Sequence, residues 1–501
     1  MSKNKKTVPT VKPEDSLKKK TISGLFWRFG ERITAQIISF TVSIVLARIL
    51  LPEQYGTIAC VTIFITLANV FVTSGLGTSL VQKKNSDDLD FSTMFWTSIS
   101  ISIVMYAILF FAAPLIAAAY HDPILTPVIR VMGLKLPIAA ISSIQQAYVT
   151  KKMIFKKFFF STLFGTLVSA VVGIVMALKG FGVWALIAQY FTNSIVDTVV
   201  LFITVDWRPK FLFSKERFKK LFSYGWKIMA SSFIGTLFDQ LRGLVIGLRY
   251  TASDLAFNNK GEQIPAIITG NLNVAFDTVL FSSIAKIQDD REAVKRVLRR
   301  STKIGAYLLC PLLLGLAAVG ETLITVLLTD KWIACVPYLQ VICFQQIFSI
   351  LNTINMQAIK AVGRSDIILK LEFIKKPIYL TMIICSIPFG PLAICTANAL
   401  YGVIALIINT RHNKKVFDYT LREQLKDIVG YIALSSIMAI IVFFIGRIQM
   451  NIYLLLIVQV LAGGAIYYIL SRIFHVELLN TLTDSAKKYL KNLKQKKETA
   501  K

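Results

Sequence analysis

Two polar stripes run along apolar stretches of this sequence, where ionisable side chains are costly and therefore functional candidates. Their members recur at helical spacing: Arg28, Arg32, Gln36, Ser39 and Ser43 in the first stripe, and Lys227, Ser231, Gly235, Asp239 and Arg242 in the second. Two such helices facing each other would line a cationic cleft. A cleft of this kind suits a pyrophosphate-like anion, because arginine offers forked donors and lysine a point charge.

Each stripe also has a structural interpretation. Arg28, Arg32 and Lys227 can extend toward the cytoplasmic interface as ordinary anchors. Arg242 lies too deep for that, but it can form a buried pair with Asp239, three residues earlier on the same helix face. The residue types alone leave both interpretations open.

Further candidates are single polar residues within apolar stretches. Lys135 lies deep enough to face a cavity, whereas Arg130 is close to a span end and is expected at the membrane interface. Amides suit sugar hydroxyls because they both donate and accept, and they also hold helices together; those singled out are Asn273, Gln345 and Asn352. Asp197 and Asp277 are candidates for binding a coupling cation, with structural pairing as the alternative.

Enzyme chemistry finds little support in these residues. The three histidines, His121, His412 and His475, lie in loops or at span ends. The sequence contains no Walker-type phosphate loop and no metal-ligand spacing of His, Cys, Asp or Glu. We therefore predict no enzymatic activity, no cofactor and no metal.

The elements that must position these side chains are long apolar helices. A helix needs roughly 20 apolar residues to cross the bilayer, and lipid offers the backbone no other hydrogen-bonding partner. Fourteen spans are predicted, at 24–50, 57–81, 92–118, 128–149, 158–178, 181–203, 224–248, 264–285, 304–328, 337–359, 370–389, 391–410, 428–446 and 451–470. The predicted fold is an all-α polytopic membrane protein.

Basic residues set the orientation. Loops after even-numbered spans are rich in Lys and Arg, as at 151–157 and 286–303, whereas loops after odd-numbered spans carry few. The positive-inside rule places the basic loops and both termini in the cytoplasm. The net charge of +28 is thus a topology signal and an attraction for anionic lipids. Its scatter over many loops argues against a nucleic-acid partner.

The chain repeats itself at an offset of about 200 residues. Trp27-Arg28 matches Trp226-Lys227, and Asp87-Asp88 matches Asp289-Asp290. Two six-helix lobes related by a pseudo-two-fold axis along the membrane normal are predicted, as in transporters built from repeats. The predicted parts are a basic tail (1–22), an N-lobe (23–203), an interfacial amphipathic helix as linker (204–223), a C-lobe (224–410), a cytoplasmic loop (411–427), two extra spans (428–470) and a second basic tail (471–501).

Three motifs carry a family resemblance. The run 46–56, Leu-Ala-Arg-Ile-Leu-Leu-Pro-Glu-Gln-Tyr-Gly, is similar to the first-helix signature of the Wzx-like polysaccharide transporters of the multidrug/oligosaccharidyl-lipid/polysaccharide (MOP) exporter superfamily. Gly75-Leu76-Gly77 resembles the end of that family's second helix, and Gln357-Ala358 with Gly363-Arg364 its tenth-helix exit. The nearest branch is that of teichuronic-acid and colanic-acid exporters. Gln54 departs from the acidic residue common there.

The resemblance implies a flippase in the bacterial plasma membrane. Its substrate would be an undecaprenyl-pyrophosphate-linked oligosaccharide, moved to the outer leaflet by alternating access. Polysaccharide polymerases and glycosyltransferases are the implied protein partners. Two alternatives stay open: a drug/cation antiporter of the same superfamily, which would favour acidic groups in the cleft, and a membrane enzyme of glycan assembly, which would need larger outer loops.

Overall fold

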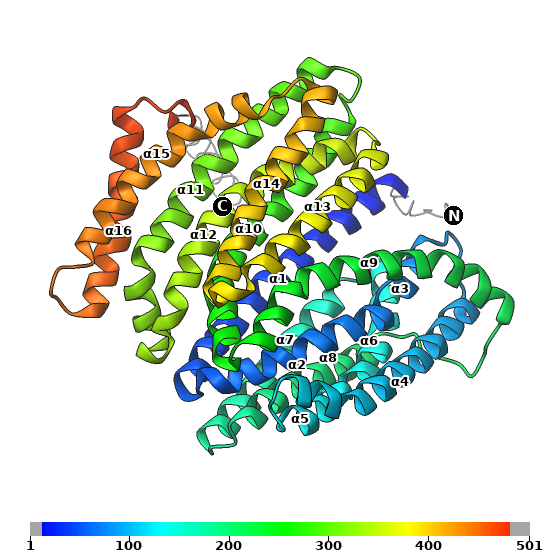
Figure 1. Cartoon of the computed structure of the whole chain (residues 1–501). Helices are drawn as coiled ribbons and strands as arrows, with labels where there is room; N and C mark the ends of the chain where they lie inside the picture. The colour runs from blue at the N-terminus through cyan, green and yellow to red at the C-terminus, as the bar shows by residue number, and fades with distance from the viewer. Residues whose placement is uncertain (1–12, 481–501) are drawn as a thin grey trace, which may run out of the picture. The chain divides into compact units, whose positions relative to one another are not determined.

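The computed structural model describes residues 13–480, and every element in that range is a helix (Figure 1). Contacts divide the chain into an N-terminal unit, residues 1–255, and a C-terminal unit, residues 256–501. The first unit contains α1 (Pro13–Ile49), α2 (Pro52–Thr73), α3 (Leu76–Gln82), α4 (Asp88–Ala119), α5 (Leu125–Gly133), α6 (Lys135–Lys152), α7 (Lys156–Leu178), α8 (Val183–Thr204) and α9 (Lys215–Arg249).

The second unit begins within α10 (Ala252–Ala285). Its other helices are α11 (Arg291–Leu328), η1 (Asp330–Cys335), α12 (Val336–Ala361), α13 (Ser365–Ser386), η2 (Ile387–Phe389), α14 (Pro391–Phe417), α15 (Leu421–Ile445) and α16 (Ile452–Ile473). The lobe boundaries expected from the repeat come from sequence matches, whereas these two units come from contacts in the structure. The lobe boundaries therefore stay a prediction.

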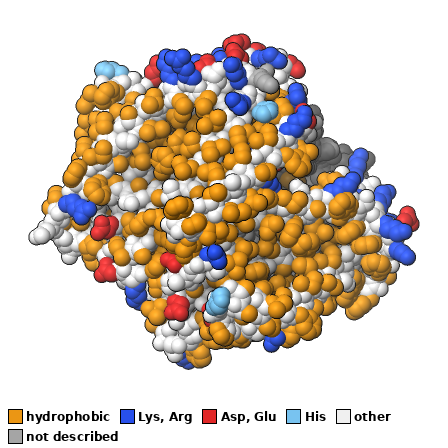
Figure 2. All heavy atoms as spheres, viewed as in Figure 1, with side chains coloured by type: hydrophobic (Ala, Val, Ile, Leu, Met, Phe, Trp, Pro, Cys, Tyr) orange, Lys and Arg blue, Asp and Glu red, His pale blue; other side chains and the backbone are white. Residues whose placement is uncertain are grey.

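Twelve helical stretches within the described residues are long and apolar enough to cross a membrane. The two remaining predicted spans correspond to α9 and α13, which are helices of 35 and 22 residues but carry more polar side chains. The all-α multi-pass class is therefore confirmed, and fourteen helices are compatible with it. Figure 2 shows broad hydrophobic areas on the face it draws, in keeping with exposed side chains such as Phe111 and Leu115, each 75% exposed.

The linker differs from the amphipathic helix expected over 204–223. Residues 205–214 are not helical, and α9 begins only at Lys215, where the Ser214 hydroxyl caps its first turn. Pro209 explains the break, because proline disfavours helical backbone at the preceding residue. Trp207 anchors the segment: it is 5% exposed, and its ring lies 5.6 Å from that of Phe91.

The first motif of the family resemblance is a tight junction between α1 and α2. Pro52 occupies the first turn of α2, and the Gln54 side-chain oxygen accepts a hydrogen bond from the Leu51 backbone N–H at 3.0 Å. An acidic side chain offers the same acceptor, which explains why Gln54 is tolerated. At Gly56 an added Cβ would lie 1.8 Å from the Ala252 carbonyl oxygen, so only glycine fits.

The second motif interrupts a helix that the sequence predicted as one span over 57–81. Gly75 separates α2 from α3 with a φ of 89°. A Cβ there would lie 2.2 Å from the backbone oxygen of Gly225 on α9. Gly75 therefore serves two purposes: residues with side chains rarely adopt its positive φ, and a Cβ would not fit the close backbone approach.

Charged clusters join helix starts within each unit. Asp90, fully buried at the start of α4, contacts Lys83 at 2.5 Å and Arg217 of α9 at 3.0 Å. In the C-terminal unit, Asp427 of α15 accepts two hydrogen bonds of 2.8 Å from Arg299 of α11. In both units an ion pair joins helices that lie far apart in the sequence, with separations of 127 and 128 residues.

Orientation can be tested by accessibility to a membrane-impermeant maleimide. In a background carrying Cys385→Ser, because Cys385 is the exposed native cysteine among the described residues, we expect Lys179→Cys and Gln449→Cys to react on intact cells. Lys84→Cys and Gln288→Cys should react only after permeabilisation, since the positive-inside rule places them in the cytoplasm. Strong external labelling of either of these two would reverse the predicted topology.

Candidate substrate-binding cavities

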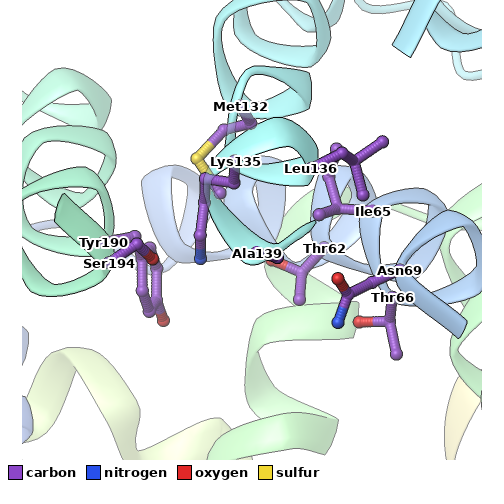
Figure 3. A pocket seen from close by; sticks show the side chains of 10 residues that line it. All are labelled: Thr62, Ile65, Thr66, Asn69, Met132, Lys135, Leu136, Ala139, Tyr190 and Ser194. Atoms are coloured by element: carbon purple, nitrogen blue, oxygen red, sulfur yellow. The ribbon is translucent and has the colours of Figure 1, made fainter. Parts of the chain in front are cut away.

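A cavity of about 290 Å³ lies within the N-terminal unit, between α2, the α5–α6 junction and α8 (Figure 3). Pro137 explains the junction, because proline cannot donate the helical hydrogen bond to the carbonyl four residues back, which belongs to Gly133. The helix that follows begins at Lys135. The lining residues are Thr62, Ile65, Thr66, Asn69, Met132, Lys135, Leu136, Ala139, Tyr190 and Ser194.

Lys135 is the charged residue among these ten. Its ammonium lies 5.1 Å from the centre of the Tyr190 ring, and Figure 3 shows its side chain extending between Tyr190 and Thr62. Among the side chains that the structure describes, none forms an ion pair or hydrogen bond with it. Its place in the first turn of α6 is also unfavourable, because helix N-termini attract negative charge. Lys135 is therefore a cation that faces a cavity with no opposing carboxylate among the ten lining residues.

The other predicted cations whose side chains the structure describes do not line this cavity. Arg32 on α1 is exposed and Gln36 is half-buried, whereas the Arg28 side chain lies outside the described part of the structure. On α9, Lys227 and Asp239 are exposed and Arg242 is buried. Arg130, expected at an interface, lies with its guanidinium 4.3 Å from the centre of the Phe110 ring. The cationic cleft expected between the two polar stripes stays a prediction.

A second cavity, of about 490 Å³, lies within the C-terminal unit and is rich in amides. Three predicted site residues meet there, Asp277 from α10 and Gln345 and Asn352 from α12, whereas Asn273 does not line it. Other lining residues were not predicted from the sequence, among them Ser349, Glu372, Lys375, Asn398, Tyr401 and Asn409. The charges of α13 inside an apolar span were the available signal for Glu372 and Lys375.

Not all amides of α12 face this cavity. Asn355, 1% exposed, exchanges hydrogen bonds with Gln424 of α15 at 3.0 and 3.1 Å and accepts one from Asn413 of α14. This cluster matches the structural interpretation of intramembrane amides, because each side chain joins one helix to another.

The two candidate acids for cation coupling lie in different surroundings. Asp277 accepts a hydrogen bond of 2.7 Å from Gln357. Asp197 of α8 packs against Gly165 of α7, and its Oδ1 is buried without a hydrogen-bond partner in the described structure. Among the described residues, no group of three or more His, Cys, Asp or Glu is arranged to hold a metal. Cation coupling stays a prediction.

Residues 45–337, more than half of the chain, match the family model described as "Polysaccharide biosynthesis protein". The chain belongs to this family. It is 24% identical over 455 residues to the succinoglycan biosynthesis transport protein ExoT of Rhizobium meliloti, a match that covers 90% of this chain and 92% of that protein. It is 26% identical over 403 residues to the lipopolysaccharide biosynthesis protein WzxC of Escherichia coli, which covers 79% and 80%.

A third relative is the teichuronic acid biosynthesis protein TuaB of Bacillus subtilis, 23% identical, with 91% of this chain and 96% of that protein covered. Solved structures share the fold. The lipid II flippase MurJ in an inward closed conformation superposes with a TM-score of 0.72 at 16% identity, over 91% of this chain and all of MurJ. An inward-facing multidrug resistance transporter of the MOP superfamily gives 0.59 at 12% identity, over 76% and 94%.

These matches confirm the family resemblance drawn from the three motifs. The chain is a multi-pass membrane protein of the family described as "Polysaccharide biosynthesis protein", and it shares its fold with a solved transporter of the MOP superfamily. Both Gly56 and Gly75 fall within the matched residues, so the two motifs that shape the ends of α2 belong to the part of the chain that defines the family.

Proposed function

We propose that this protein is a flippase that moves an undecaprenyl-pyrophosphate-linked oligosaccharide from the inner to the outer leaflet of the bacterial plasma membrane. Alternating access of two lobes would carry the substrate, with both termini in the cytoplasm. The observation that carries the proposal is Lys135, a cation facing a cavity within a membrane-spanning unit and lacking a carboxylate partner among the described residues.

The electrostatics of this cavity favour an anionic cargo. Holding the charged Lys135 ammonium within a membrane protein costs free energy. A bound anion offsets this cost, because its attraction to the ammonium is strong in a poorly hydrated site. A pyrophosphate supplies such an anion on every lipid-linked precursor, whatever its sugars. A cation antiporter would need an acid in the same place, and the ten lining residues include none.

The polar stripes of α1 and α9 extend this proposal. We assign Arg28, Arg32, Gln36, Lys227, Asp239 and Arg242 to the surface along which the pyrophosphate moves. Arg242 has the most weight among them, because its side chain is only 8% exposed and a guanidinium in that position binds phosphate through a planar fork.

Deletion of the gene tests the function directly. We expect lipid-linked oligosaccharide to accumulate and to stay protected from a lectin added to intact spheroplasts, because the substrate remains on the cytoplasmic leaflet. Surface polysaccharide should be lost, and the wild-type gene in trans should restore it. If deletion leaves the surface polysaccharide intact, or if the accumulated lipid is accessible from outside, the protein is not this flippase.

A further inference from the structure

The cavity of the C-terminal unit differs in charge from that of the N-terminal unit. Its described lining holds two acids, Asp277 and Glu372, and two bases, Lys360 and Lys375, so it is formally neutral. Lys375 is 7% exposed and contacts Glu372 at 2.7 Å, which neutralises it locally. A diphosphate would gain little electrostatic attraction from a lining without net charge. An uncharged polar ligand does not depend on such attraction.

Hydrogen-bonding capacity dominates the lining instead. Asn409 of α14 donates to the Asn352 side-chain oxygen at 2.9 Å, and Asn398 donates to that of Gln345 at 3.2 Å. Asn352 in turn donates to the Gly402 carbonyl at 3.2 Å. The amides are therefore held in fixed orientations between α12 and α14, which is how a polar site keeps its groups ready for a ligand.

Two lining groups remain without partners in the described structure. The side-chain oxygen Oδ1 of Asn409 and the Ser349 hydroxyl are both buried and make no hydrogen bond. Asn409 as a whole is 1% exposed. An unsatisfied buried polar group costs about 1–3 kcal/mol. A ligand that carries hydroxyl groups can satisfy both, because a hydroxyl can donate to an amide oxygen or accept from a serine.

An aromatic side chain completes the lining. Tyr401 of α14 lies with its ring centre 4.7 Å from that of Tyr379 on α13, so its orientation is fixed by packing. Tyrosine presents an apolar ring and a polar tip, a combination that suits the alternating C–H and O–H surface of a sugar. The volume of about 490 Å³ is within the range of small-molecule sites.

We propose that this cavity is the saccharide-binding site of the transporter and recognises the hydroxyl groups of the oligosaccharide. The inference rests on the proposed function and assigns the two parts of the substrate to different units. The C-terminal unit binds the sugars, and Lys135 of the N-terminal unit binds the anion. Substrate selectivity between different glycans would then reside in α12, α13 and α14.

The test uses the purified full chain in nanodiscs and a probe without lipid or phosphate. The probe is the oligosaccharide repeat released from the surface polysaccharide of the same organism, and binding is measured by saturation-transfer difference NMR. We expect the wild type to bind and Ser349→Ala and Asn409→Ala to bind at least five-fold more weakly. Inorganic pyrophosphate should not displace the saccharide, because the cavity is formally neutral.

Asn355→Ala is the matched control. It removes a buried amide from the same helix, α12, but from the cluster with Gln424 that does not line the cavity, so stability should fall while saccharide affinity persists. Ser349→Ala removes one oxygen and guards against misfolding of the asparagine variant.

The inference is overturned if wild-type protein does not bind the saccharide, if Ser349→Ala and Asn409→Ala bind it as the wild type does, or if pyrophosphate displaces it. Those results leave the flippase function untouched, because that function is tested by gene deletion. Conversely, saccharide binding combined with a deletion that leaves the polysaccharide intact would contradict the flippase and keep the site.

Discussion

Gly75→Ala should remove most of the folded protein from the membrane. Alanine in left-handed backbone costs about 1–2 kcal/mol, and the new Cβ would lie 2.2 Å from the Gly225 carbonyl oxygen. That contact involves backbone on both sides, so no side chain can rotate away, and overpacking adds about 1–3 kcal/mol. The sum is a large part of the stability of an ordinary domain. Fluorescence-detected size-exclusion chromatography of solubilised membranes would measure the loss.

Gly180→Ala separates strain from close packing. Gly180 has a similar φ of 79°, but an added Cβ there would meet nothing within 4 Å. Only the cost of placing alanine in backbone with a positive φ applies here, so the variant should retain most of the wild-type abundance. If the two substitutions lower abundance equally, the contact between Gly75 and Gly225 does not stabilise the N-terminal unit.

Lys135→Ala should reduce export of the lipid-linked oligosaccharide roughly ten- to one-hundred-fold at wild-type protein abundance. Hydrogen bonds to charged groups contribute about 1.5–3 kcal/mol each, and a factor of ten corresponds to about 1.4 kcal/mol. Lys135→Arg should restore part of the activity because the charge survives. The measurement is surface polysaccharide produced by the deletion strain carrying each variant, normalised to the amount of transporter.

Arg130→Ala provides the matched control for this prediction. Arg130 is a cation five residues earlier, but it packs on Phe110 and does not line the cavity. Its loss should leave export nearly unchanged. The same assay extends to Arg242→Ala, for which we expect reduced export. Normal export by both Lys135→Ala and Arg242→Ala would refute an anion path through these cations.

The sequence by itself determined the membrane class, the succession of helices and the family. In the hydrocarbon core of a membrane, long apolar runs must form helices. The positions of these runs in the sequence therefore specify where helices such as α4 and α16 lie. The motif at 46–56 identified the family because the α1–α2 junction needs proline, an acceptor at Gln54 and a glycine at fixed spacing. These requirements involve residues that are close together in the chain, so the sequence alone is enough to recognise them.

Only the tertiary structure decided which polar residues meet. Lys135 and Arg32 are equally conspicuous in the sequence, yet Lys135 lines a cavity with Thr62 and Tyr190, whereas Arg32 does not line it. Asn409 reaches Asn352 across 57 residues of chain, and no periodicity predicts that pairing. The sequence sets which face of a helix is polar. Which helix that face meets depends on packing among segments far apart in the chain.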